Sequence, residues 1–248
     1  INYDKLLLLG DSLMEFCYNQ LPYSHESPTD STPNDKNHIN QNEAEYFNQQ
    51  IHFTFGSALA HVYTRKLDIV QRGFGGYNTS HISLLLESLL NNDEFVKNLK
   101  LIIISGGTND ASTQDNAYLS LKDVRSNFVK MIKLIKEKNI NLIIIGSPVY
   151  FPEIFSKMCY EDVQKGYNLD NDLVLQYHNQ ARELCEQNDI PFLDLRSIMI
   201  DNYNSTLTSD GLHLSGYGQY LLYKEMMRLI KQHFPQLYPD NIIKKLPT

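Results

Sequence analysis

The sequence predicts an α/β fold in which five parallel strands form one sheet with helices on both faces. Two observations lead to this fold class. Short runs of Leu, Ile and Val without polar alternation recur along the chain, as is typical of strands buried on both faces of a parallel sheet. Between them lie longer stretches whose apolar residues recur every three or four positions, as in amphipathic helices. Such regular alternation indicates an open parallel sheet.

The five expected strands are short apolar runs bounded by polar or glycine residues. Each run has the length of a strand, about 4–8 residues, and is too short for a helix of its own. The first ends in a Gly-Asp-Ser sequence, and the third reads LKLIIIS. The expected strands span residues 6–9, 67–71, 99–105, 141–146 and 191–195.

Four long helices are expected between and after these strands. The second has the clearest beginning, because Ser120 is followed three residues later by Asp123, close to a capping box. The last one reads SGYGQYLLYKEMMRLIKQHF. The helical periodicity covers residues 51–62, 121–135, 173–184 and 215–234.

Two segments lie outside this pattern. Residues 24–50 are rich in Asn, Asp, Ser, Thr and Pro, and we interpret them as a polar insertion without a catalytic role. A lid is the alternative, since Tyr46 and Phe47 could fold over a pocket. The tail at 235–248 carries several apolar residues, so we expect it to pack on its own domain or to cross to a second copy in a homodimer.

Length, charge and cysteine content limit the class of protein. The 248 residues suit one large α/β domain, so residues 1–248 are expected to form a single domain. A formal net charge of −7 argues against a general nucleic-acid binder. No run approaches the roughly 18 apolar residues of a membrane span. Three cysteines without CxxC spacing fit free thiols, and we therefore expect a cytoplasmic protein.

Four glycine-containing segments lie where strands end or where the last helix begins. GDSLMEF follows the first expected strand, RGFGGYNTS the second and GGTNDAS the third, while SDGLHLSGYG precedes the last helix. The carboxyl ends of parallel strands share one edge of a sheet, where ligands bind. A serine, glycine amides, an asparagine and an Asp-x-x-His pair can therefore meet there. Acyl transfer needs this set of groups: a nucleophile, oxyanion donors, a base and its orienting carboxylate.

In this order, the segments GDSLMEF, RGFGGY, GTND and DGLH resemble the motif blocks of the GDSL, or SGNH, hydrolase family of esterases and lipases. The resemblance spans nearly the whole chain and implies a flavodoxin-like domain. Within the family, LLLLGDSLMEF, YTRKLDIVQRGFGGY and LTSDGLHLSGYG are most similar to the isoamyl-acetate-hydrolysing esterases.

The resemblance also implies the catalytic residues and the reaction. Ser12 corresponds to the nucleophile, His213 to the base and Asp210 to the carboxylate that orients it. The oxyanion donors correspond to the backbone N–H groups of Ser12 and Gly76 and to the side chain of Asn109. The implied reaction is hydrolysis of short-chain acetate esters such as isoamyl acetate through an acyl-enzyme, within lipid metabolism and without cofactor or metal.

Two positions depart from the family pattern, and two other functions stay open. Met14 stands where the family often has Thr, and Gln71 where it often has Asn. These two differences bear on the geometry of the loops around the site and not on the reaction.

The same catalytic residues could act on acetylated sugars, lysophospholipids or thioesters. A Gly-Asp-Ser turn alone could also bind an anion at a helix N-terminus, so a flavodoxin-like anion-binding module is the non-enzymatic alternative.

Candidate substrate-binding residues are less specific. Phe74 and Tyr77 flank the expected oxyanion loop, and Val149 and Tyr150 follow the fourth strand; ordinary core contacts explain all four equally well.

Asp11 and Asp110 are expected to accept hydrogen bonds in loops or helix caps, and Cys17 to fill the core. The histidines other than His213 are expected to pack or to face solvent, and no spacing of His, Cys and carboxylate residues indicates a zinc site.

Overall fold

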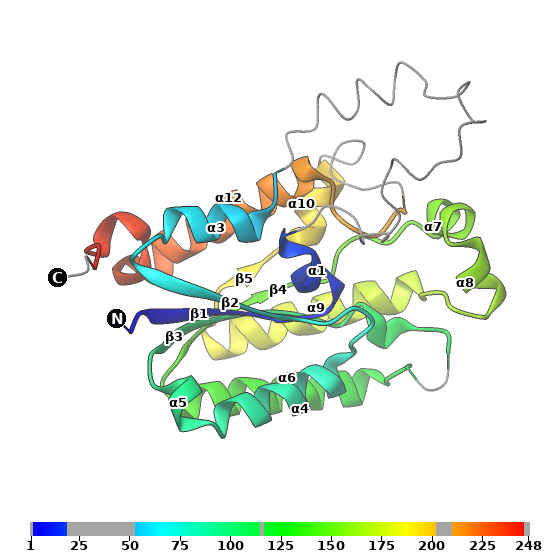
Figure 1. Ribbon diagram of the computed structural model, residues 1–248. Coiled ribbons are helices and arrows are strands. Elements are labelled where there is room, and N and C mark those ends of the chain that lie inside the picture. The colour runs from blue at the N-terminus through cyan, green and yellow to red at the C-terminus, as the bar shows by residue number, and fades with distance from the viewer. Residues whose placement is uncertain (1, 19–52, 115–116, 202–209, 246–248) are drawn as a thin grey trace, which may run out of the picture.

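The computed structural model describes residues 2–18, 53–114, 117–201 and 210–245. Its five strands form one parallel sheet in the order β2-β1-β3-β4-β5 (Figure 1). This strand order is that of flavodoxin-like folds, and it confirms the expected fold class. The strands are β1 (Asp4–Gly10), β2 (Leu67–Gly73), β3 (Leu99–Ser105), β4 (Asn141–Ile145) and β5 (Phe192–Leu193).

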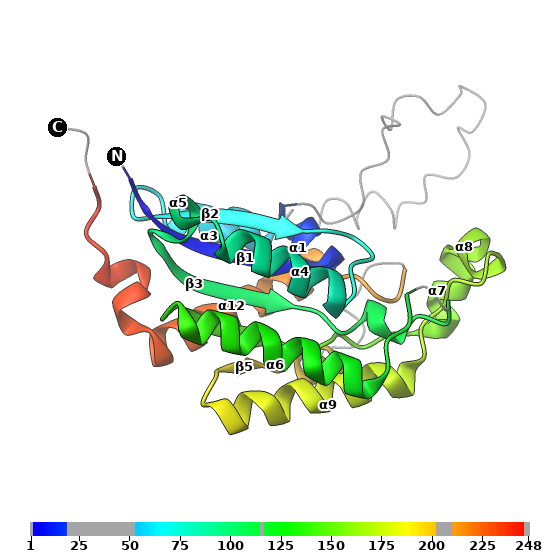
Figure 2. The same cartoon turned by 90° about the horizontal axis from the view of Figure 1, so that it is seen from below.

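Helices cover both faces of the sheet (Figures 1 and 2). One face carries α3 (Phe55–Val62), α10 (Leu195–Asp201) and α12 (Gly216–His233). The other carries α4 (Thr79–Leu90), α6 (Leu121–Glu137) and α9 (Asn171–Asn188). Shorter helical pieces are α1 (Ser12–Glu15), η1 (Phe16–Tyr18), α5 (Asp93–Val96), η2 (Asn109–Ala111), α7 (Pro152–Met158), α8 (Tyr160–Gln164), η3 (Pro235–Leu237) and η4 (Pro239–Asn241).

The two faces of the sheet hold two separate hydrophobic cores. In β1, Leu7 and Leu9 belong to the core under α4, α6 and α9, whereas Leu6 and Leu8 belong to the core under α3 and α12. All four side chains are fully buried. Successive residues of a strand point to opposite faces, so a strand covered on both sides needs apolar residues at every position. This explains the uninterrupted apolar runs in the sequence.

The four expected long helices are confirmed as α3, α6, α9 and α12, although residues 51 and 52 lie outside the described residues. The prediction for the fifth strand was too long. Strand β5 has only two residues, because the chain turns directly into α10. The turn is fixed by Asp194, whose carboxylate accepts hydrogen bonds from the Ser197 backbone N–H at 3.0 Å and from its hydroxyl at 2.8 Å. The insertion at 24–50 also lies outside the described residues.

The C-terminal tail packs on the domain that carries it as far as Lys245. Leu237 is buried in the core under α12, and its carbonyl accepts a hydrogen bond from the hydroxyl of Tyr63 at 2.8 Å. Lys245 donates its backbone N–H to the carbonyl of Arg65, just before β2, at 2.8 Å. Its ammonium donates to the carbonyl of Asn2, at the start of the chain, at 2.9 Å. These contacts hold the tail against its own chain, although Ile243 is 88% exposed, and the homodimer stays a prediction.

Truncation of the chain after Phe234 is expected to lower the free energy of unfolding by roughly 3 kcal/mol or more, because it removes a buried leucine and leaves the Tyr63 hydroxyl without its acceptor. Urea unfolding measures this loss. The mass from light scattering should be the same for both forms, whereas a halved mass after truncation would show that the tail joins two copies.

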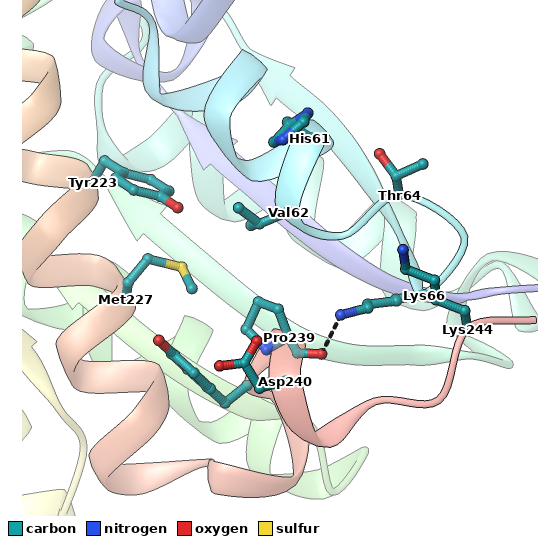
Figure 3. A pocket seen from close by; sticks show the side chains of 10 residues that line it. His61, Val62, Thr64, Lys66, Tyr223, Met227, Pro239, Asp240 and Lys244 are labelled. Carbon is teal, nitrogen blue, oxygen red and sulfur yellow. Dashed lines mark hydrogen bonds between the residues drawn. The ribbon is translucent and has the colours of Figure 1, made fainter.

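An open pocket of about 500 Å³ lies beside this tail (Figure 3). It is formed by the end of α3, by α12 and by η4, and the ammonium of Lys66 donates to the carbonyl of Pro239 at its rim. Residues 62–66 lead into the start of β2, so the pocket lies at the edge of the sheet where strands begin. It contains none of the candidate catalytic residues.

Two further features concern the cysteines and the apolar length of the helices. None of the three cysteines, Cys17, Cys159 and Cys185, forms a disulfide, as predicted. No helix in the described part of the chain is long and apolar enough to cross a membrane.

Candidate active site

The candidate catalytic residues meet at the edge of the sheet where strands end. Ser12 follows β1, Gly76 follows β2 and Asn109 follows β3, while Asp210 and His213 directly precede α12. Ligands of open parallel sheets bind at this edge. The fold thus brings together two residues, Ser12 and His213, that are 201 positions apart.

A chain of two hydrogen bonds joins a hydroxyl, an imidazole and a carboxylate. The Oγ of Ser12 lies 2.9 Å from Nε2 of His213, and Nδ1 of His213 lies 2.6 Å from Oδ2 of Asp210. A carboxylate only accepts hydrogen bonds, so it fixes the proton of a neutral His213 on Nδ1. Nε2 is then left as an acceptor facing the serine hydroxyl, as a general base requires.

Asp210 also holds the loop that carries His213. The second oxygen of Asp210, Oδ1, accepts the backbone N–H groups of Leu212 and His213, both at 2.9 Å. Asp210 therefore fixes the backbone of His213 and its ring at the same time. The rings of Phe16 and His213 meet in a T-shaped contact, with 5.0 Å between their centroids.

The short helix α1 begins at a buried aspartate. Asp11 is the N-cap residue: it accepts the Leu13 N–H at 3.1 Å and the hydroxyl of Ser105 on β3 at 3.2 Å. Burial raises the pKa of the Asp11 carboxyl above its ordinary value, although these hydrogen bonds oppose the shift. Ser12 is the first helical residue, so its N–H has no acceptor within the helix. The expectation that Asp11 is a cap acceptor is confirmed.

The glycine loop after β2 lies directly against α1. A Cβ on Gly73 would come within 2.1 Å of the Glu15 backbone nitrogen, so no larger residue fits there. The amide of Gln71 donates to the carbonyls of Met14 at 3.2 Å and of Gly73 at 3.4 Å, and so joins helix and loop. Gln71 and the buried Met14 depart from the family pattern, yet both support this contact.

The side chain of Asn109 is oriented by two hydrogen bonds. Its Nδ2 donates one proton to the carbonyl of Tyr77 at 3.0 Å, and its Oδ1 accepts from the hydroxyl of Tyr167 at 3.3 Å. The amide group has two N–H donors, so the second one remains for a ligand at the edge of the sheet. The residue is 5% exposed, which restricts its rotamers.

The sequence is similar to those of known proteins along most of its length. The chain matches the GDSL-like Lipase/Acylhydrolase family over residues 8–221. The chain belongs to this family. It is a hydrolase of the GDSL type, as the resemblance of its four motif blocks predicts.

Relatives match along nearly the whole chain. The isoamyl acetate-hydrolyzing esterase of Saccharomyces cerevisiae is 30% identical over 250 residues, which cover 99% of this chain and 94% of that protein. The human isoamyl acetate-hydrolyzing esterase 1 homolog is 28% identical over 244 residues, covering 95% and 84%. Among solved structures, a lipase/acylhydrolase from Enterococcus faecalis shares the fold with a TM-score of 0.60 and 18% identity, covering 98% of this chain and all of that one.

Asp110 follows Asn109 in the GTND block and joins η2 to the start of α4. Its carboxylate accepts the Thr79 backbone N–H at 3.0 Å and the Thr79 hydroxyl. Asp110 thus accepts hydrogen bonds, as expected, rather than facing the site. Burial raises the pKa of the Asp110 carboxyl from 3.8 to about 6.

The raised pKa of Asp110 gives a testable pH dependence of stability. Between pH 3.8 and about 6, the Asp110 carboxyl is protonated in the native protein and ionised in the unfolded chain. Its contribution to stability is therefore present at low pH and is lost as pH rises through this window, by about 1.4 kcal/mol for each pH unit between the two pKa values. We expect the free energy of unfolding of the wild type, minus that of Asp110→Asn, to fall between pH 4 and pH 7 in urea titrations. An unchanged difference would contradict the assignment.

The candidate substrate-binding residues separate into two groups. Phe74 and Tyr77 stack on each other at 4.9 Å beside the glycine loop, and Phe74 is 36% exposed. Val149 and Tyr150 are 6% and 1% exposed and belong to the two hydrophobic cores. Of these four residues, Phe74 and Tyr77 offer a surface that a substrate could contact.

A second His–Asp contact has a different surrounding. The buried Nε2 of His178 lies 3.3 Å from Oδ1 of Asp194, but Arg182 donates to this same nitrogen at 3.0 Å and also to Asp194. Burial lowers the pKa of His178. Nε2 of His178 faces the Arg182 guanidinium and not a hydroxyl, so this histidine has no nucleophile to activate. The contact between His178 and Asp194 instead connects α9 to the end of β5. Among the described residues, no group of three His, Cys, Asp or Glu side chains could hold a metal ion.

Two contributors to the site geometry were not found from the sequence. Glu15 and Tyr167 hold the glycine loop and Asn109 through hydrogen bonds. Glu15 could have been noticed, because it lies three residues after Ser12 and thus on the same face of a helix. Tyr167 has no sequence signal, since its contact joins segments 58 residues apart.

Proposed function

We propose that this protein is a serine esterase that hydrolyses short-chain acetate esters, such as isoamyl acetate, through an acyl-enzyme. One observation carries the proposal: the unbroken hydrogen-bond chain from Ser12 through His213 to Asp210, at the ligand-binding edge of the sheet. This arrangement supports the roles that we propose for Ser12, His213 and Asp210.

In the first half-reaction, Oγ of Ser12 attacks the ester carbonyl carbon while its proton passes to Nε2 of His213. The carbon–oxygen bond to the alcohol then breaks, and the same nitrogen returns the proton to the leaving alkoxide. Asp210 keeps the ring in the required tautomer and stabilises the imidazolium that forms in between. An acetyl-serine and a free alcohol result.

Three donors stabilise the negative charge that develops on the carbonyl oxygen. They are the N–H groups of Ser12 and Gly76 and the second N–H of Asn109. In the second half-reaction, His213 takes a proton from water as the water oxygen attacks the acetyl carbon. The bond from that carbon to Oγ of Ser12 then breaks, and His213 returns the proton to Oγ. The product is acetic acid, which ionises to acetate and a proton in solvent. The ester, one water molecule and these side chains account for every atom and proton of the cycle.

Support for a small substrate comes from two sources. The yeast and human relatives carry the name isoamyl acetate-hydrolyzing esterase or homolog of it. In the structure, the stacked pair Phe74 and Tyr77 is the apolar surface next to Gly76, and the Phe16 ring lies against His213. This aromatic surface suits a short branched alkyl group.

A panel of esters tests the proposal. We expect kcat/KM to be highest for acetates of small alcohols, including isoamyl acetate, and to decrease as the acyl chain of p-nitrophenyl esters is lengthened. Higher kcat/KM for acetylated xylan, lysophospholipids or acyl thioesters would replace the proposed substrate class while retaining the catalytic residues. Absence of any hydrolysis would favour the anion-binding alternative.

A further inference from the structure

We propose that Glu15 is a positioning residue that holds the glycine loop, residues 74–77, in the conformation that directs the Gly76 N–H toward the substrate. Its carboxylate oxygen Oε2 accepts the backbone N–H of Gly75 at 2.8 Å. Gly75 directly precedes Gly76, so the hydrogen bond lies one peptide away from the proposed oxyanion donor. The inference rests on the proposed function, because it assigns Glu15 a role in the same reaction.

The loop that Glu15 contacts is a four-residue turn with two glycines at its centre. The N–H of Tyr77 bonds to the carbonyl of Phe74 at 3.2 Å, and Gly76 has a φ of +77°. A positive φ at the third residue is the conformation of a type II turn. A Gly-Gly centre does not select this turn by itself, because glycine populates both signs of φ about equally.

The conformation of this turn decides which group faces the substrate. Types I and II differ by rotation of the central peptide, here the one between Gly75 and Gly76. That rotation exchanges the direction of the Gly76 N–H for that of the Gly75 carbonyl. A carbonyl in this place would repel the developing oxyanion instead of stabilising it. The turn must therefore be held from outside.

Glu15 is suited to this task because it shares α1 with the nucleophile. Ser12 and Glu15 are three residues apart and lie on the same side of the helix. The side chain of Glu15 thus connects the helix that supplies one backbone oxyanion donor to the loop that supplies the other. Hydrogen bonds to a charged acceptor are stronger than neutral ones, which matters at a solvent-exposed turn. Gln71 joins the same two elements from the buried side.

The role predicts a specific set of kinetic results. Glu15→Ala should lower kcat about tenfold with little change in KM, because the hydrogen bond affects the oxyanion donor and not the alkyl contacts. Glu15→Gln keeps an acceptor oxygen and should retain activity within about threefold of wild type. Glu137→Ala removes an exposed carboxylate at the far end of α6 and serves as the matched control.

A proline at position 75 provides a rescue. Gly75 is not among the residues with positive φ, and proline is favoured at the second position of a type II turn. Gly75→Pro removes the N–H that Glu15 binds but restricts the turn covalently. A Cβ at position 75 would meet only the Glu15 carboxylate, and this group is absent in the Glu15→Ala background. The double variant Glu15→Ala/Gly75→Pro should therefore recover most of the lost kcat.

The experiment measures kcat and KM on p-nitrophenyl acetate for these variants, with circular dichroism and thermal unfolding as folding controls. Labelling of wild-type Ser12 by a fluorophosphonate is measured first, and failure there would refute the proposed function rather than the role of Glu15. With Ser12 labelled, reduced kcat in Glu15→Ala, retained activity in Glu15→Gln and rescue by proline support the proposal. Unchanged kcat in Glu15→Ala, or an equal loss in Glu15→Gln, overturns it.

Discussion

Replacement of Asp210 by asparagine is expected to reduce kcat about 10,000-fold while the loop keeps its conformation. The Oδ1 of asparagine can still accept the N–H groups of Leu212 and His213, as Asp210 does. The other terminal atom becomes an NH₂ donor facing Nδ1 of His213. This forces the imidazole proton onto Nε2, which then cannot accept the proton of Ser12. The loss should appear in kcat for p-nitrophenyl acetate, with near-normal KM and thermal stability.

The second His–Asp contact of the chain provides a matched control. Asp194→Asn makes the same substitution beside His178, whose Nε2 faces Arg182 instead of a serine. We expect this variant to lose stability, because Asp194 also caps α10, but to retain most of its kcat. Equal activity losses in both variants would contradict the assignment of Asp210.

Replacement of Asn109 by alanine is expected to lower kcat about 100- to 1,000-fold, the usual effect of losing one oxyanion donor. The amide has one N–H bonded to the Tyr77 carbonyl, and the other is available to the transition state. KM should change little, since the donor stabilises charge that exists only transiently. Steady-state kinetics on a good acetate ester measures the effect.

Tyr167→Phe provides the graded comparison for Asn109. It removes the hydroxyl that bonds to Oδ1 of Asn109, so the amide is less firmly oriented but still present. We expect a loss of about threefold to tenfold, well below that of Asn109→Ala. A nearly normal turnover in Asn109→Ala would remove this side chain from the mechanism.

The sheet could be predicted from the sequence because its residues interact in a regular pattern. Strands β1 and β3 are covered on both faces, so their runs of Leu and Ile carry a strong signal. Helix α4 was not among the expected helices, because its sequence signal is weaker. Its capping box is formed by Asn78 and His81 instead of a Ser or Thr and a Glu or Gln. The two-residue β5 ends where Asp194 begins to cap α10, a contact with no periodic signal.

The candidate site was predictable to the extent that its groups follow strands. The sequence pattern placed a serine, glycine amides, an asparagine and an Asp-x-x-His pair at one edge of a parallel sheet. Resemblance to the family motifs then assigned their roles to Ser12, Gly76, Asn109, Asp210 and His213. The contacts that orient them were not predictable, since Glu15 and Tyr167 bond to segments 60 and 58 residues away; only the position of Glu15 on the helix of Ser12 gave a signal. The burial of Val149 and Tyr150 was not predictable either, because it depends on the tertiary packing of the two hydrophobic cores.

Covalent labelling of Ser12 tests the central claim most directly. The intact protein is treated with a fluorophosphonate, digested, and mapped by mass spectrometry, in parallel with Ser12→Ala and His213→Ala. We predict a single phosphonylated serine at position 12, formed in step with loss of esterase activity, no labelling in Ser12→Ala and strongly slowed labelling in His213→Ala. Full inactivation with the label on another residue, or esterase activity that persists in Ser12→Ala, would contradict the account.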